Sequence, residues 1–131
     1  MTSAESFRSP DATPALDPEV LHAADQGDPV ALTRAMVATP SVNPSLEDGG
    51  PGEAAMALRT AAWLKAWGFE TRIHEVLPGR PNVVATLGNG EKTLLLNGHL
   101  DTVGTSGMAV PPFAGVSREG RIVGRGAADM K

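Results

Sequence analysis

The 131-residue chain has no cysteine and no tyrosine, and its aromatic residues are limited to 3 Phe and 2 Trp. The absence of cysteine excludes a disulfide framework, a thiolate nucleophile and a Cys-ligated zinc site, so a metal ion would need His, Asp or Glu ligands. With so few aromatic residues, the core must be built from aliphatic side chains and methionine. The length predicts one small domain.

The chain also lacks basic clusters and long apolar runs. It carries 11 Lys plus Arg against 15 Asp plus Glu, a formal net charge of −4. This charge pattern argues against a nucleic-acid partner or an anionic membrane surface, and no apolar run reaches the roughly 18 residues of a membrane helix. We therefore expect a small-molecule or peptide partner. Because no targeting signal is recognisable, we also expect a cytoplasmic location.

Residues 1–17 are predicted to form a disordered leader ahead of a domain spanning residues 18–131. The leader is rich in Ser, Thr, Pro and Ala, and its acidic side chains outnumber its arginine. This composition is typical of neither a secretory signal nor a transit peptide.

Three helices are predicted in the first half of the domain. Asp17-Pro18 and Asp28-Pro29 each place an N-cap residue before a proline at the first helical position. A third, Ala-rich segment has a broad apolar face and ends at Gly68. The predicted helices span residues 18–26, 29–39 and 53–67, with a loop rich in helix breakers at 40–52.

After Gly68 the apolar residues alternate or form short runs, which predicts strands. The expected strands span residues 69–76, 82–87 and 93–96. Gly88-Asn89-Gly90 predicts a hairpin between the second and third of them. A further hairpin is expected over residues 116–123. Helices followed by strands predict an α/β domain with a layered arrangement and a mixed sheet.

Residues 128–131 have the pattern of a helix that is only beginning. From this pattern we expect a chain truncated at Lys131.

His99 and Asp101 follow an apolar run, Leu94–Leu96, and stand two positions apart. In an extended chain such residues face the same way, so their side chains can converge at the carboxyl end of a strand, where α/β sheets bind ligands. A carboxylate beside an imidazole fixes its tautomer and makes it a better metal ligand. By itself, the same pair is equally compatible with a hydrogen-bonded histidine and a turn-capping aspartate.

Asp129 follows a glycine-rich turn, Gly124–Gly126, that comes after a short strand. Taken alone, Asp129 is typical of a helix N-cap. The segment can also be compared with a dinucleotide-binding loop, but Asp129 then replaces the third glycine and its charge would face the pyrophosphate. A nucleotide-binding module is therefore the weaker alternative.

Taken together, Gly98–Val103, Gly124–Lys131 and the loop Ala38–Pro44 resemble the M20 family of metallopeptidases. This family includes acetylornithine deacetylase, succinyl-diaminopimelate desuccinylase and carboxypeptidases. The combined pattern is more specific than any of its parts, and the resemblance covers residues 29–131. It implies the N-terminal part of a layered α/β/α zinc-peptidase catalytic domain with a mixed sheet.

The resemblance also implies roles for individual residues. His99 matches a ligand of one metal ion, Asp129 matches the carboxylate that bridges both metals, and Asp101 matches the catalytic acidic partner that steadies His99. Family members bind two Zn²⁺ ions per complete site, and some use Co²⁺. A bridging carboxylate suits two cations only about 3.5 to 4 Å apart.

The function implied is metal-dependent hydrolysis of amide bonds in N-acyl amino acids or small peptides, by an enzyme of the deacetylase type that could form a homodimer. The family's general base and remaining ligands are expected beyond Lys131. We therefore expect the chain by itself to be inactive. The alternative from a different class is a non-catalytic, truncated or vestigial fragment.

Overall fold

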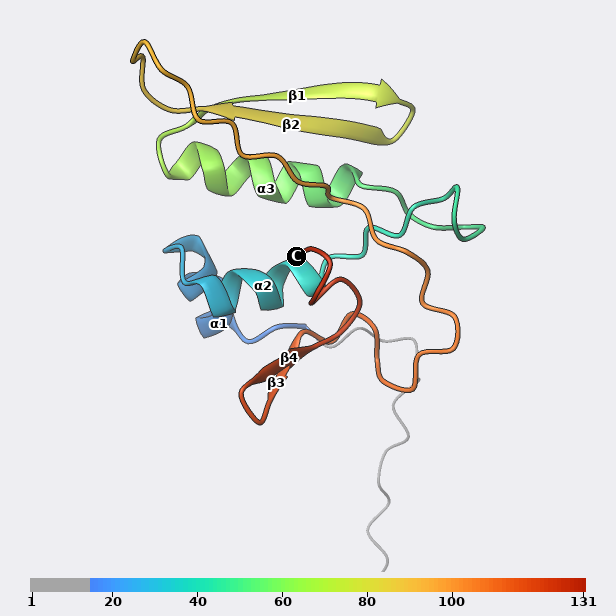
Figure 1. Ribbon diagram of the computed structural model, residues 1–131. Coiled ribbons are helices and arrows are strands. Elements are labelled where there is room, and N and C mark those ends of the chain that lie inside the picture. Colours follow the sequence, from blue (N-terminus) through green and yellow to red (C-terminus); the bar gives the residue numbers. More distant parts are fainter. Residues whose placement is uncertain (1–14) are drawn as a thin grey trace, which may run out of the picture.

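The computed structural model describes residues 15–131 and contains three helices and two hairpins (Figure 1). The leader expected over residues 1–17 falls mainly on residues 1–14, which lie outside the described residues. The elements are α1 (Pro18–Asp25), α2 (Pro29–Val37), α3 (Ala54–Ala66), β1 (Glu70–Leu77), β2 (Arg80–Thr86), β3 (Val116–Arg118) and β4 (Arg121–Val123).

The two Asp-Pro pairs begin helices as predicted. The Oδ1 atom of Asp17 accepts a hydrogen bond from the backbone N–H of Glu19, and that of Asp28 accepts one from Ala31, both at 2.8 Å. These bonds satisfy amide groups that have no partner within the first turn of a helix. All three predicted helices are present, each slightly shorter than expected.

The core lies where the three helices meet. Helix α3 packs on one side against the β1–β2 hairpin and on the other against the pair α1 and α2, which gives a layered arrangement (Figure 1). Small side chains allow the close approach of the helices. The buried cluster consists of Ala24, Ala31, Ala35, Met56 and Trp63. This arrangement is consistent with an α/β fragment of an M20-type domain.

Both hairpins are antiparallel. The β3–β4 hairpin turns at Glu119 and Gly120, as predicted, and both residues have positive φ. The β1–β2 hairpin turns at Pro78-Gly79, where Gly79 has a φ of 73°. Because hairpin turns of this kind need positive φ, glycine is favoured at these positions.

The strand predicted at residues 93–96 and its hairpin at residues 88–90 are wrong in this structure. Leu94, Leu95 and Leu96 are 83–84% exposed, and no strand is assigned between residues 87 and 115. An apolar run becomes a strand only when another strand donates and accepts its backbone hydrogen bonds, and the described residues offer this run no such neighbour.

A short parallel contact between Val42 and Thr102 places the loop over residues 40–52 beside residues 100–102. The Thr102 N–H donates to the carbonyl of Ser41, and the Asn43 N–H donates to the carbonyl of Thr102, both at 2.9 Å. The Ser41 hydroxyl donates to the carbonyl of Leu100 at 2.7 Å. The loop thereby lies directly against the segment that carries His99.

The helix start predicted at residues 128–131 is also wrong, because residues 125–130 form consecutive turns. Gly126 has a φ of 86°, outside the helical region, and its carbonyl accepts the N–H groups of Asp129 and Lys131. The Lys131 ammonium group donates to the carbonyls of Met36 and Thr39 at 3.0 and 2.6 Å. This caps the C-terminal end of α2 and fixes the turn that carries Asp129.

Within residues 15–131, every helix is too short or too polar to span a bilayer.

Candidate metal centre

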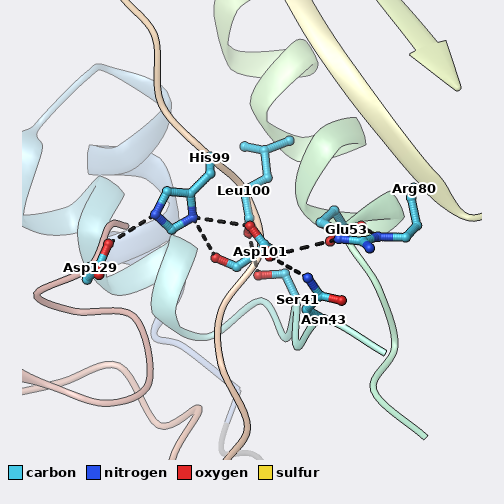
Figure 2. A network of polar contacts seen from close by, with 8 residues as sticks. All are labelled: Ser41, Asn43, Glu53, Arg80, His99, Leu100, Asp101 and Asp129. Carbon is cyan, nitrogen blue, oxygen red and sulfur yellow. Dashed lines mark hydrogen bonds and ion pairs between the residues drawn. The ribbon is translucent and has the colours of Figure 1, made fainter. Parts of the chain in front are cut away.

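His99 lies between two aspartates (Figure 2). Its Nε2 atom is 3.0 Å from Asp129 Oδ1, and its Nδ1 atom is 3.2 Å from Asp101 Oδ1 and 3.0 Å from the backbone carbonyl of Asp101. The structure thus brings together the three residues singled out in the sequence, although His99 and Asp129 are 30 positions apart.

The two aspartates differ in their exposure to solvent. The side chain of Asp101 is 27% exposed, that of His99 is 47% exposed, and that of Asp129 is 85% exposed. Asp101 therefore lies behind the imidazole, on the protein side, and Asp129 lies at the open side. An ion from solution can reach the Nε2 atom of His99 from the Asp129 side.

The hydrogen bond to Asp129 is the main reason why the pKa of His99 is raised above its ordinary value of 6.5, and the hydrogen bond to the Asp101 carbonyl adds to the effect. Acceptors at both ring nitrogens favour the doubly protonated imidazolium. Burial also lowers the pKa of Lys131, which is in the same turn as Asp129, to about 8.

Replacing Asp129 by asparagine is expected to lower the pKa of His99 in the metal-free chain, because the largest favourable contact of the imidazolium is then lost. In the wild type, this contact stabilises the folded chain fully at pH values below the unfolded-state pKa of about 6.5, and the stabilisation disappears as the pH rises through the raised pKa. An NMR titration of the His99 ring protons measures the shift. An unchanged His99 pKa in the Asp129→Asn variant would show that the contact with Asp129 does not raise this pKa.

Asp101 is also held by residues that the sequence pattern did not single out as site residues. Its Oδ2 atom accepts a hydrogen bond from Asn43 Nδ2 at 2.8 Å and lies 3.8 Å from Arg80 Nη2 (Figure 2). Arg80 in turn forms a bidentate ion pair with Glu53. The hydrogen bonds to Glu53 raise the pKa of Arg80.

Asn43 could have been identified as a site residue from the sequence, since it lies in the loop Ala38–Pro44 that contributes to the family resemblance. Glu53 and Arg80 are 27 positions apart and belong to no common motif. Only the packing of the β1–β2 hairpin on α3 brings them together.

The donor atoms of His99 and Asp129 fit a divalent metal ion. A tetrahedral ion with bonds of about 2.0 to 2.2 Å would separate an imidazole nitrogen and a carboxylate oxygen by about 3.4 Å. The observed separation of 3.0 Å is only slightly shorter. Imidazole and carboxylate are ligand types that zinc prefers.

These residues supply only part of a ligand set. Asp101 contacts Nδ1, the ring nitrogen opposite the one that faces Asp129, so the three side chains do not converge on one point. Among residues 15–131, no group of three or more His, Cys, Asp or Glu side chains is arranged to hold a metal ion.

Part of the chain matches a known protein family. Residues 95–131, which include His99, Asp101 and Asp129, match the model of peptidase family M20/M25/M40. The chain is an M20 family member. It is 35% identical over 98 residues to acetylornithine deacetylase of Vibrio campbellii (strain ATCC BAA-1116), an alignment that covers 73% of this chain and 26% of the relative.

Two further relatives of this M20 chain have the same name. It is 37% identical over 106 residues to acetylornithine deacetylase of Proteus mirabilis (strain HI4320), covering 78% of this chain and 27% of the relative. It is 38% identical over 106 residues to that of Photorhabdus laumondii subsp. laumondii, covering 78% and 28%. The chain therefore spans about a quarter of the length of the curated relatives it matches.

Proposed function

We propose that this chain supplies part of the active site of a metal-dependent amide hydrolase, with His99 and Asp129 as metal ligands and Asp101 as the partner that steadies His99. The observation that carries the proposal is the pairing of His99 Nε2 with Asp129 Oδ1 at 3.0 Å while Nδ1 is held by Asp101. The M20 match over the same residues supports it.

Two neighbouring aspartates orient His99 as a metal ligand. The carboxylate and carbonyl of Asp101 hold a proton on Nδ1, so Nε2, which faces Asp129 and the solvent, is the ring nitrogen that would exchange its proton for a metal ion. The negative charge of Asp129 favours a cation at the same point. A divalent ion such as Zn²⁺ or Co²⁺, when bound, would supply Lewis acidity toward an amide carbonyl.

We propose amide bonds of N-acyl amino acids as the substrate class. The support comes from the curated relatives, which are named acetylornithine deacetylases. A small substrate also agrees with the acidic composition, which has no basic cluster for a polyanion.

We further propose that the 131-residue chain alone does not hydrolyse amides. Catalytic zinc ordinarily takes three protein ligands and a water molecule, whereas His99 and Asp129 supply two. The lack of a three-residue metal cluster among residues 15–131 supports this part of the proposal.

Metal binding by the purified chain tests the proposed ligands directly. Replacing His99 by alanine is expected to abolish the binding of Zn²⁺ observed by isothermal titration calorimetry, because one of the two donor groups is removed. His74→Ala is the matched control, since His74 is exposed on β1 and should not affect binding. Equal Zn²⁺ binding by the wild type and the His99→Ala variant would refute the ligand assignment.

Substrate hydrolysis tests the activity. An M20 protein that contains residues 15–131 together with the remainder of the enzyme is expected to release acetate from N-acetylornithine when Zn²⁺ or Co²⁺ is supplied. The 131-residue chain under the same conditions is expected to release none. Metal-dependent turnover by the chain itself would contradict the proposal that it is inactive alone.

A further inference from the structure

The carboxylate of Asp101 needs more than its contact with His99 to stay in place. A single contact fixes neither the χ1 rotamer of an aspartate nor the plane of its carboxylate group, since rotation about the terminal bond is soft. In this structure the two oxygens are divided between two neighbours. Oδ1 lies 3.2 Å from His99 Nδ1, and Oδ2 accepts the hydrogen bond from Asn43 at 2.8 Å.

Asn43 is itself fixed in orientation. Its Oδ1 atom accepts a hydrogen bond from the Ser45 N–H at 2.9 Å, and its own N–H donates to the Thr102 carbonyl. Because the side-chain oxygen is engaged with Ser45, the amide nitrogen must point toward Asp101. The loop over residues 40–52 therefore presents a hydrogen-bond donor to Asp101 in a defined direction.

Arg80 places a positive charge on the same side of Asp101. Its Nε atom lies 3.1 and 3.0 Å from the two carboxylate oxygens of Glu53, and its Nη2 atom lies 3.8 Å from Asp101 Oδ2. The Glu53 side chain is only 7% exposed and that of Arg80 is 26% exposed. Since Glu53 precedes α3 and Arg80 begins β2, their ion pair fixes the guanidinium between helix and hairpin.

From this arrangement we infer that Asn43 and Arg80 are positioning residues, which hold the carboxylate of Asp101 so that it faces Nδ1 of His99, and that Glu53 fixes Arg80 in place. All three lie before residue 95, outside the segment that matches the family model. The importance of this arrangement for metal binding rests on the proposed function, but the positioning itself is a property of the metal-free chain.

Solution NMR of the metal-free chain measures the positioning. Three-bond couplings of Asp101 are expected to show one staggered χ1 rotamer in the wild type, and averaging over several rotamers in Asn43→Asp and Arg80→Gln. Asn43→Asp keeps the oxygen that accepts from Ser45 but replaces the donor to Asp101 with a second carboxylate oxygen. Retention of a single wild-type rotamer in both variants would overturn the inference.

Matched controls separate positioning from a general loss of structure. Asn89→Asp makes the same chemical change at an exposed position, and Arg72→Gln removes an exposed arginine of the same hairpin, which pairs with Glu70. Both controls are expected to keep the wild-type couplings of Asp101. If Arg80→Gln fails to fold, Arg80→Lys provides the second test, because it keeps the charge but loses the two-pronged contact with Glu53.

Exchange of the two partners provides a rescue experiment. The double variant Asn43→Asp with Asp101→Asn restores a donor and an acceptor between positions 43 and 101, with their direction reversed. It is expected to recover a single χ1 rotamer at position 101. If the couplings at position 101 still show averaging over several rotamers, as in the Asn43→Asp single variant, the hydrogen bond does not order this side chain and the inference fails.

Zinc affinity distinguishes this inference from the proposed function. Competition with a chromogenic chelator is expected to show weaker Zn²⁺ binding in Asn43→Asp and Arg80→Gln, by no more than the about 10- to 100-fold that is typical when the direct partner of a metal ligand, here Asp101, is lost. Equal zinc affinity of the wild type and His99→Ala would reject the proposed ligands. The Asp101 couplings would still decide whether Asn43 and Arg80 position that carboxylate.

Discussion

Replacing Asp129 by asparagine is expected to reduce kcat/KM for an N-acyl amino acid by more than about 100-fold, beyond the loss typical of an outer partner. The test uses the M20 protein that contains these residues, and it rests on the proposed function. The carboxamide has the same shape but no negative charge, so it is a poor substitute at a point where cations must be held together. Kinetic assays and measurement of bound metal check the effect.

The matched variants rank the two aspartates of the site. Asp101→Asn is expected to lower kcat/KM by about 10- to 100-fold, because Asp101 acts through His99. Asp48→Asn, at an exposed position in the loop over residues 40–52, is expected to have no effect. An Asp129→Asn enzyme with wild-type kcat/KM and metal content would show that Asp129 is not a ligand.

Replacing Met56 by alanine is expected to lower the free energy of unfolding by about 2 to 5 kcal/mol. Met56 is completely buried where α1, α2 and α3 meet, and the small alanines around it cannot fill the space that it leaves. Since small domains are stable by only about 5 to 15 kcal/mol, this is a large fraction of the total. Urea denaturation monitored by circular dichroism measures the change.

Leu58→Ala is the control, because Leu58 is on the same helix but exposed. It is expected to change the unfolding free energy by no more than about 0.5 kcal/mol. Equal losses in the two variants would show that the cluster around Met56 is not the core of this chain.

The helices could be predicted from the sequence because their signals are local. Asp17 and Asp28 cap the helices that follow them, and both prolines occupy positions where a missing N–H has no cost. The turn at Glu119 and Gly120 is predictable for the same reason, since its backbone conformation favours particular residue types.

The strand at residues 93–96 could not be judged locally. An apolar run has the same appearance whether or not a partner strand is present, and its pairing depends on distant segments. The turns at residues 125–130 raise a similar difficulty. Asp129 in a glycine-rich segment is compatible with a helix start, but the backbone of Gly126 and the capping of α2 by Lys131 favour a compact turn.

The candidate site was partly predictable. The spacing of His99 and Asp101 places both on one side of an extended chain, and the structure has them in contact. The approach of Asp129 was expected only through the family resemblance. The contacts of Asn43 and Arg80 with Asp101 depend on how a loop and a hairpin pack against residues 100–102, which no local pattern encodes.

The exposed leucine run has a consequence for the order of folding. The helices and the two hairpins close over short sequence distances and form early, whereas Leu94–Leu96 has no strand beside it among the described residues. This run ends three positions before His99, so the backbone leading into the candidate site has no strand neighbour among residues 15–131. An exposed apolar run of this kind promotes aggregation, so contacts between copies of the chain would form directly beside the imidazole of His99.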